Sequence, residues 1–391
     1  MAEPASRWSV VVGFALVGAA TQVVWLNFAG VTTVAAAHYG VSENAIGWLA
    51  QVFPLLYVVL AVPAGMMLDR WFRGGLLLGA ELTAVGAAMR LGGDDSYGWL
   101  LASQLVVAVA QPLVLNAITG LAARYLAARD RPAGIAVCTA STFAGMVLAF
   151  ALSAVFPAED QLRTLLLVTA VFAVAAAITL EVVLRTASPE EHRTRAALRL
   201  AWGDGFVRWV CLLVLLPFGT FVGLTTFAQA LLEPAGVSGS TASMILLVNV
   251  VAGVAGCAVL PVVASRRRIE LPVAAVALGV TALCCLALAV APGVAVGFAT
   301  FTVIGAMLLP TMPIVLTLVE RRTGEAEGTA AGLVWLTGNL GGLVVAAAVG
   351  LLVDVPTLAF LLTGAAALAT LPLLLPLRRY VRGLSPAAPA P

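Results

Sequence analysis

The sequence predicts an all-α membrane protein of twelve transmembrane helices, arranged as two pseudo-symmetric bundles of six. Hydrophobic residues make up 62% of the 391-residue chain and charged residues 10%, whereas a soluble chain carries roughly 25% charged residues. Long apolar runs approach or exceed the length of about 20 residues that crosses a bilayer. Because backbone polar groups in lipid must be hydrogen-bonded within the protein, we expect each run to be a helix.

The apolar runs follow one another along the whole chain, separated by short polar stretches. The longest polar stretch separates the sixth run from the seventh, which gives a six-plus-six layout. The predicted spans are 8–37, 43–67, 74–92, 98–125, 132–156, 162–184, 207–233, 239–265, 270–291, 293–319, 327–350 and 355–376.

Arginine placement predicts the topology. All basic residues are arginine, and all but Arg90 and Arg163 lie near the termini or in loops that follow even-numbered spans. By the positive-inside rule, this pattern predicts a multi-pass protein of the plasma (inner) membrane with both termini cytoplasmic. The net charge of +2 follows from this placement and gives no indication of nucleic-acid binding. We expect a monomer whose surroundings are the lipid bilayer.

We expect an N-terminal bundle over 1–184, a cytoplasmic linker over 185–206 and a C-terminal bundle over 207–391 with a short disordered tail, Ser385–Pro391. The halves show weak internal similarity, in which Thr142–Gly145 aligns with Asn339–Gly342. Repeated halves are typical of transporters, whose substrate site lies near the middle of the bilayer between the repeats.

The loop after the second span reads Gly65-Met-Met-Leu-Asp69-Arg70-Trp-Phe-Arg73-Gly74. This string resembles the signature of the major facilitator superfamily at the same place, with Gly74 where the family has a basic residue. The resemblance implies that superfamily's fold and leaves the substrate open. Asp69 lies at a helix end where it can pair with an arginine and, with Arg70 and Arg73, hold a cytoplasmic gate shut. The alternative is a solvated run of charges.

The second half contains only a weak echo of this loop. Leu260-Pro261 is followed by Arg266–Arg268, and this stretch contains no acidic residue.

Polar and aromatic residues near the middle of four spans are the candidates for substrate binding, because polar groups at that depth are costly unless they are paired or face a cavity. Two tryptophans with several amides could form a neutral cage for a quaternary ammonium ion, held by cation–π contacts of about 1–2 kcal/mol per ring. Alternatively, the amides join helices and the tryptophans pack against lipid. The candidates are Thr21, Gln22 and Trp25 in the first span, Gln104, Gln111 and Asn116 in the fourth, Thr225, Thr226, Phe227 and Gln229 in the seventh, and Trp335 and Asn339 in the eleventh.

A more specific resemblance extends from the first span through the eleventh. It is carried by Trp25, by Tyr39-Gly40-Val41 with Ala45-Ile46 and Trp48-Leu49, by Val109-Ala110-Gln111, and by Glu327-Gly328-Thr329 with Gly332. These strings resemble the feline leukaemia virus subgroup C receptor-related (FLVCR) family. The resemblance implies transport of choline and related amines, and haem export has also been attributed to the family.

The family's choline site is an aromatic cage with glutamines, and the resemblance transfers its positions to this chain. The cage tryptophan falls on Trp25, one glutamine on Gln111 and the other on Asn339, while the cage tyrosine falls on Thr226. The family's Asn-Gln pair falls on Thr142-Phe143. One aromatic ring is therefore missing unless Trp335, Phe227 or Phe143 supplies it, so a different amine or another small polar solute is an alternative substrate.

Acidic residues within spans bear on coupling. Glu81, in the first half of the third span, could carry a proton, or it could pair with an arginine or extend to the cytoplasmic face. Glu181 lies one turn before Arg185 and should form an intrahelical ion pair. The first span and the middle of spans 4, 7 and 11 contain no acid, so we expect facilitated diffusion of the solute.

Two other functions are compatible with the sequence. One is proton-coupled export of drugs or metabolites through Glu81, and the other is a membrane receptor or scaffold that transports nothing. We expect neither an enzyme nor a bound cofactor or metal, since all five cysteines lie inside spans and the two histidines, His38 and His192, are not at ligand spacing from them.

Overall fold

The computed structural model describes residues 6–93, 96–186, 202–323 and 327–382, and every regular element in them is helical. Eleven helical segments are long and apolar enough to cross a membrane. The predicted third span is α4 (Phe72–Met89), which carries Arg73 and Glu81 and is not among these eleven. The predicted all-α membrane fold with twelve spans is confirmed. The chain divides into two compact units, Met1–Ala196 and Ala197–Pro391.

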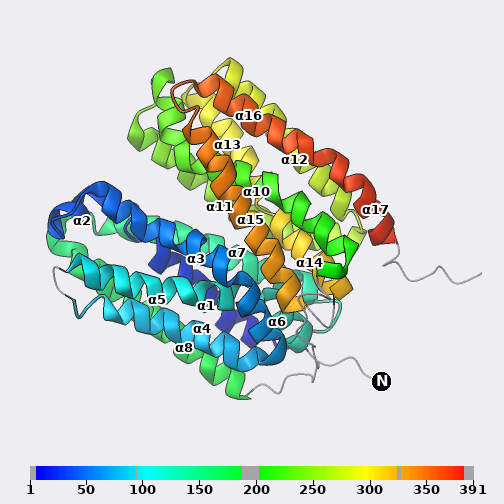
Figure 1. Ribbon diagram of the computed structural model, residues 1–391, viewed down its shortest axis with the longest axis horizontal. Coiled ribbons are helices and arrows are strands. Elements are labelled where there is room, and N and C mark those ends of the chain that lie inside the picture. Colours follow the sequence, from blue (N-terminus) through cyan, green and yellow to red (C-terminus); the bar gives the residue numbers. More distant parts are fainter. Residues whose placement is uncertain (1–5, 94–95, 187–201, 324–326, 383–391) are drawn as a thin grey trace, which may run out of the picture. The chain divides into compact units, whose positions relative to one another are not determined.

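The N-terminal unit contains the blue-to-green helices of Figure 1. Its first helix, α1, packs against α7 and α8, α4 packs against α5 and α8, and α3 packs against α5. The helices of this unit are α1 (Trp8–Leu26), α2 (Thr32–His38), α3 (Glu43–Arg70), α4 (Phe72–Met89), α5 (Tyr97–Leu115), α6 (Ala117–Tyr125), α7 (Arg131–Val155) and α8 (Leu162–Thr186).

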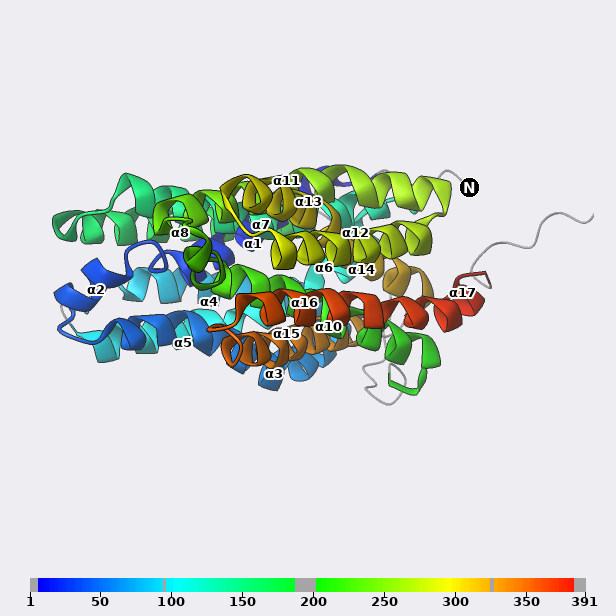
Figure 2. The same ribbon diagram turned by 90° about the horizontal axis from the view of Figure 1, so that it is seen from above.

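The C-terminal unit repeats this kind of packing. Its α10 packs against α15 and α16, α11 packs against α13, and α12 packs against α13 and α16 (Figure 2). The helices of this unit are α10 (Gly205–Leu232), α11 (Gly239–Arg267), α12 (Glu270–Val290), α13 (Val294–Leu308), α14 (Thr311–Thr323), α15 (Glu327–Gly350), α16 (Pro356–Thr370) and α17 (Leu374–Arg382).

Several helices begin at a residue whose side chain accepts a hydrogen bond from a backbone N–H of the first turn. Such a cap satisfies a donor that the helix itself leaves without a partner. The caps are Ser42 before α3, Ser96 before α5, Asp204 before α10 and Ser238 before α11.

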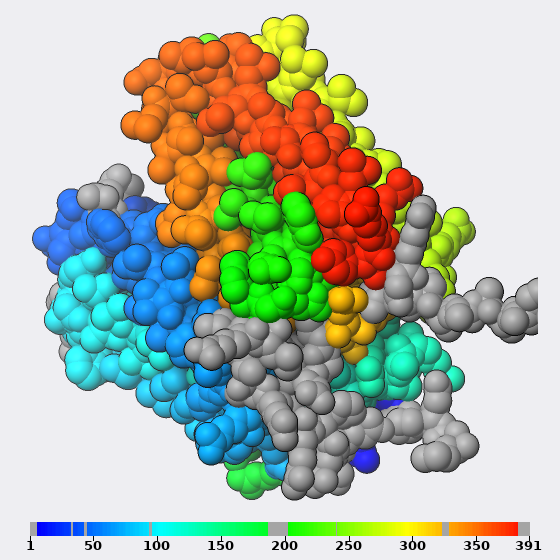
Figure 3. Space-filling view, turned by 45° about the vertical axis from the view of Figure 1, so that its right-hand side comes forward, coloured from blue at the N-terminus to red at the C-terminus, as the bar shows by residue number. Residues whose placement is uncertain are grey.

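Four predicted spans are interrupted, so their continuous boundaries were wrong in detail. The first span ends as α1 at Leu26, and α2 follows after a short turn. The fourth is broken at Asn116, and the tenth is broken before α14 at Pro310, which cannot donate a backbone hydrogen bond. The twelfth passes through a short 3-10 turn with Pro372 and continues as α17, and Figure 3 shows this red segment on the surface.

Glycines bring one pair of helices into close contact in each unit. A Cβ on Gly145 of α7 would overlap the carbonyl oxygen of Ala19 in α1. A Cβ on Gly341 of α15 would overlap the carbonyl oxygen of Leu215 in α10. Small residues allow such backbone approach between membrane helices, so the two halves use the same device at corresponding crossings.

Two expectations fall mainly outside the described residues. The linker expected over 185–206 includes 187–201, and the tail Ser385–Pro391 follows the last described residue.

Candidate functional site

Trp25, near the end of α1, contacts α3 in two ways. Its indole Nε1–H donates a hydrogen bond of 2.8 Å to the carbonyl oxygen of Ala50. Its ring stacks on Phe53, with centroids 5.7 Å apart and an interplanar angle of 27°. Phe53 is fully buried, whereas Trp25 is only partly buried. Trp25 therefore keeps some accessible surface although its indole N–H is already occupied. Sequence reasoning did not identify Phe53.

Two buried amides on α1 and α5 have polar atoms without a partner among the described residues. Gln22 is 2% exposed, and its Nε2 donates a long bond of 3.4 Å to Thr21 Oγ1 while its Oε1 has no donor. Gln111 is 3% exposed, and its Nε2 has no acceptor. A buried polar atom without a partner costs about 1–3 kcal/mol. These two amides are therefore able to bind the polar groups of a ligand.

Gln104 serves a different purpose from Gln111, although both lie on one face of the predicted span. Its Oε1 accepts a hydrogen bond from Arg90, and its Nε2 donates to the carbonyl oxygen of Leu49 at 3.0 Å. Arg90 is 3% exposed and also donates to Val24 O at 2.8 Å and to Asn27 Oδ1 at 3.2 Å. These bonds join the ends of α1 and α4 to α5. Arg90 lies outside the arginine-rich loops in the sequence, and this unusual position was the only indication of a buried polar network here.

Thr142 of α7 is buried beside α1. Its hydroxyl donates to the carbonyl oxygen of Thr139 at 2.7 Å, as threonine often does within a helix. Its methyl group lies 3.4 Å from where a Cβ on Gly18 would be. Thr142 thus lines the α1–α7 contact and keeps only the acceptor capacity of its hydroxyl.

Tyr57 and Asn116 form a second buried polar contact in this unit. The Tyr57 hydroxyl donates to Asn116 Oδ1 at 2.5 Å, and Asn116 Nδ2 donates to the carbonyl oxygen of Ala61 at 2.7 Å. Asn116 occupies the break between α5 and α6, so this contact ties the broken fourth span to α3. Asn116 is one of the polar residues of the fourth span in the sequence, whereas Tyr57 was not among the predicted site residues.

In the C-terminal unit, Trp335 and Asn339 come together as their i, i+4 spacing predicts. Asn339 Nδ2 donates to the carbonyl oxygen of Trp335 at 2.9 Å. Trp335 is buried, and its ring meets Phe218 of α10 edge to face, with centroids 6.1 Å apart. Phe218, which sequence reasoning missed, is therefore an aromatic neighbour of Trp335.

Thr226 and Phe227 lie elsewhere on α10. Thr226 is exposed, and the Phe227 ring packs against Gly350, 3.0 Å from where a Cβ would be. Gly350 ends α15, fifteen residues beyond Trp335, which corresponds to about 22 Å along a helix. The structure therefore does not bring Phe227 to Trp335.

The loop of the Asp69 motif packs against α6. Asp69 is buried at the end of α3, Arg70 is exposed, and Arg73 is partly buried in α4. The Arg124 guanidinium of α6 lies over the Phe72 ring, 4.5 Å from its centroid, and donates to Gly120 O. The motif therefore joins the ends of α3 and α4 to the last turn of α6.

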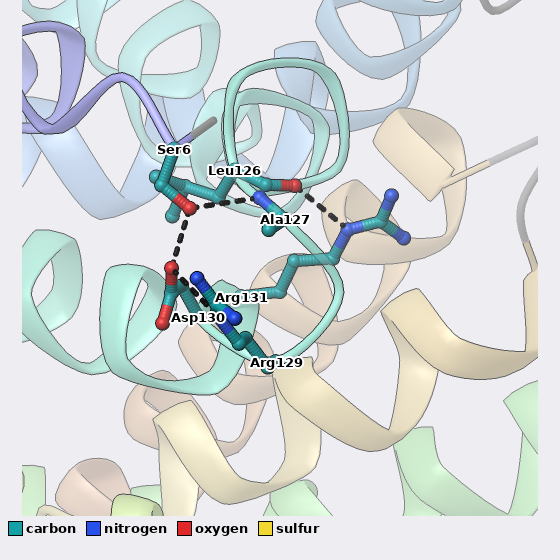
Figure 4. Close-up of polar contacts among 6 residues, drawn as sticks. All are labelled: Ser6, Leu126, Ala127, Arg129, Asp130 and Arg131. Carbon is teal, nitrogen blue, oxygen red and sulfur yellow. Dashed lines mark hydrogen bonds and ion pairs between the residues drawn. The ribbon is translucent and has the colours of Figure 1, made fainter. Parts of the chain in front are cut away.

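Close to this end of the unit, the chain before α1 is fixed to the loop between α6 and α7. Ser6 Oγ donates to Asp130 Oδ2 at 2.5 Å and accepts from the backbone N–H of Ala127 at 3.0 Å. Arg131 Nε donates to the carbonyl oxygen of Leu126 at 3.3 Å (Figure 4).

The C-terminal unit has a buried acid at its corresponding end. Glu270, the first residue of α12, is 2% exposed, and its Oε1 accepts from Arg321 Nη1 at 2.8 Å. Arg321 also donates to Ser265 Oγ at the end of α11. In the second half, the acidic residue at this end is therefore the first residue of α12. It lies just after Leu260–Arg268, the stretch that contains no acidic residue.

Arg322, the neighbour of Arg321, holds the start of α10. Its Nε donates to Asp204 Oδ2 at 2.9 Å. Its guanidinium lies 5.5 Å from the ring centroid of Phe206 and 5.1 Å from that of Tyr380 in α17. This contact connects the ends of α10, α14 and α17.

Glu81 is exposed and Glu181 is partly buried. Glu81 lies on the exposed face of α4 with Val85. The predicted intrahelical pair is confirmed, because Glu181 Oε1 accepts from Arg185 Nη2 at 2.5 Å.

Known proteins resemble this chain in sequence. Solute carrier family 49 member A3 of Danio rerio is 26% identical over 360 residues, which cover 85% of this chain and 76% of that protein. The choline/ethanolamine transporter FLVCR2 of Homo sapiens is 26% identical over 147 residues, 37% of this chain. The chain spans only 28% of the length of that human protein.

Solved structures share the fold at low sequence identity. The transporter FucP in its outward conformation is 16% identical with a TM-score of 0.75, over 97% of this chain and 100% of that one. The human organic anion transporter MFSD10 is 16% identical with a TM-score of 0.77, over 94% and 99%.

The Major Facilitator Superfamily profile matches residues 10–346. With the helical fold and these relatives, this match confirms the resemblance seen in the sequence. The chain therefore belongs to the Major Facilitator Superfamily and is a multi-pass membrane transporter that resembles the FLVCR family.

Proposed function

We propose that this protein is an alternating-access carrier of a small organic solute, a choline-like amine or another small polar solute, by facilitated diffusion. The observation that carries the proposal is the Trp25–Phe53 stack on α1 and α3. The indole N–H is occupied by Ala50, so Trp25 offers a ligand its ring face. A cation over such a face gains about 0.5–2 kcal/mol.

The polar part of the solute is assigned to the amides. Gln22 Oε1 can accept a hydrogen bond and Gln111 Nε2 can donate one, and neither atom has a partner among the described residues. Thr21 and Thr142 provide additional acceptor atoms on α1 and α7. A hydroxyl group, which both donates and accepts, suits this set.

In the second half, Trp335 and Asn339 offer the same chemistry on α15. The aromatic neighbour of Trp335 within this unit is Phe218, which meets it edge to face, so Phe218 and not Phe227 or Thr226 is the ring that accompanies Trp335. The resemblance to human FLVCR2, a choline/ethanolamine transporter, supports an amine substrate.

The proposed cycle needs no proton carrier. The first span and the middle of spans 4, 7 and 11 contain no acid, and Glu81 lies on an exposed face. A membrane potential that is negative inside would still favour entry of a cation, by about 2.3 kcal/mol per charge per 100 mV.

The charged helix ends are the proposed gate. Asp69, Arg70 and Arg73 act in the first half, and the Glu270–Arg321 pair acts in the second. By the positive-inside rule, these ends and both termini face the cytoplasm of a cell whose inner membrane holds the protein. We also propose that the protein is a monomer with halves 1–184 and 207–391 joined by the linker 185–206.

Uptake of labelled choline into liposomes that contain the purified protein tests the proposal. Wild-type protein should give saturable uptake, and Trp25→Ala should raise KM at least about tenfold, since the variant loses a desolvated cation–π contact. Trp48→Ala removes an exposed tryptophan of α3 and should leave uptake unchanged. 3,3-Dimethylbutanol, a neutral choline analogue, should compete poorly. Absent wild-type uptake would rule out choline as the substrate, and equal effects of both variants would rule out Trp25 as part of the binding site.

A further inference from the structure

Pro54 lies inside α3, four residues after Ala50. In a regular helix, the carbonyl oxygen of Ala50 would accept the backbone N–H of residue 54, but proline has none. A buried carbonyl without a donor is costly, and such groups are almost always satisfied in other ways. Here the donor is the Trp25 indole Nε1–H, at 2.8 Å. An indole of α1 thus replaces the backbone hydrogen bond that α3 lacks.

The same turn of α3 supplies a second constraint on this indole. Phe53 precedes Pro54, is fully buried and stacks on the Trp25 ring at 5.7 Å. Stacking alone would let the indole slide or rotate within its plane. The hydrogen bond to Ala50 removes that freedom because it fixes the direction of the N–H.

We propose that Pro54 is a positioning residue for Trp25: by leaving the Ala50 carbonyl without a helical donor, it creates the acceptor that orients the indole. This inference rests on the proposed function, in which the Trp25 ring face contacts the substrate ammonium. It adds that the indole N–H takes no part in substrate recognition. The substrate's hydrogen bonds must then come from groups such as Gln22 and Gln111.

The same helix contains a control residue. Pro63 is also inside α3, and the carbonyl that it leaves without a helical donor belongs to Val59. Within the described part of the chain, no side chain donates to Val59. Pro63→Ala therefore makes the same chemical change as Pro54→Ala in the same helix, without a tryptophan that depends on it.

A transport measurement forms the first arm of the test. Pro54→Ala restores a backbone donor that competes for Ala50, and we expect KM for choline to rise about 2- to 10-fold, as for loss of one hydrogen bond, with Vmax little changed. Pro63→Ala should leave KM within about twofold of wild type, below the effect of one hydrogen bond. In a Trp25→Phe background, which has the ring but no N–H, Pro54→Ala should have no further effect on KM. An equal rise in KM in that background would overturn the proposal.

The second arm reads the indole directly and requires no transport. In protein labelled with 15N-indole, the Trp25 signal is the one that Trp25→Phe removes. Pro54→Ala should shift this signal and speed its hydrogen exchange, whereas Pro63→Ala should leave it in place. A Trp25 signal unchanged by Pro54→Ala would overturn the proposal. If wild-type protein does not carry choline, the proposed function fails, but this arm still decides whether Pro54 positions Trp25.

Discussion

Glu270 and Arg321 form an ion pair of 2.8 Å between the start of α12 and the last turn of α14. Glu270 is buried, and the side chain of Arg321 is one-third exposed. In the first half, Arg124 occupies the last turn of α6 and lies over Phe72 beside the Asp69 motif. In each half, the helix that ends the fourth span (α6 or α14) carries an arginine in its last turn. That arginine contacts the first residue of the third span, which is Phe72 in α4 and Glu270 in α12.

Glu270→Gln should destabilise the protein, because the buried arm of the pair loses its charge while Arg321 keeps its own. Loss of a charged hydrogen bond costs about 1–3 kcal/mol, which corresponds to a fall in Tm of at least about 2 °C. The measurement is thermal unfolding in detergent. Glu181→Gln breaks the exposed Glu181–Arg185 pair and should cost about 0.5 kcal/mol or less. The double variant Glu270→Arg/Arg321→Glu restores a pair of opposite charges and should be more stable than Glu270→Gln. Equal falls in Tm for Glu270→Gln and Glu181→Gln would contradict this assignment.

The two glutamines of α5 should separate stability from binding. Gln104→Leu removes one of the three acceptors of buried Arg90 and should lower stability by about 1–3 kcal/mol. Gln111→Leu removes an amide whose Nε2 has no partner among the described residues, so Tm should stay the same or rise while KM for choline increases. Parallel Tm and uptake measurements check this, and a large fall in Tm for Gln111→Leu would show that its role is structural.

Gly145→Ala should weaken the α1–α7 contact. The added methyl would overlap the carbonyl oxygen of Ala19, and overpacking of this kind costs about 1–3 kcal/mol. Gly341→Ala should act in the same way at the α10–α15 contact. Gly279→Ala is the control, because a Cβ there meets nothing within 4 Å. Folded yield and Tm should fall for the first two variants only.

Glu81→Gln should leave transport unchanged with and without a pH gradient, since Glu81 lies on an exposed face of α4 and no polar group of the proposed site is known to contact it. Uptake into liposomes with an imposed gradient checks this expectation. Loss of gradient-driven flux in Glu81→Gln alone would instead favour the proton-coupled exporter.

The features that depend on local sequence could be predicted well. The number of membrane spans follows from the length of the apolar runs, and the Glu181–Arg185 pair follows from helical spacing, because residues three or four apart share a face. The breaks in the spans were missed. Pro310 and Pro372 mark two of them in the sequence, whereas the break at Asn116 is accompanied by bonds to α3, which is distant in sequence.

The sequence by itself determined the membrane fold, the charged helix ends and the family resemblance, because each depends on composition, loop position or a contiguous motif. Only the tertiary structure decided that Phe53 and Phe218 are the rings beside the two tryptophans, that Glu270 is the acid for Arg321, and that Gln104 and Gln111 differ. These relationships join residues on different helices, and side-chain periodicity within one helix carries no information about which residue of another helix lies opposite. The carbonyl of Ala50 depends on both. Pro54 in the sequence leaves this carbonyl without a helical hydrogen-bond donor, and only the packing of α1 against α3 brings the Trp25 indole N–H to it.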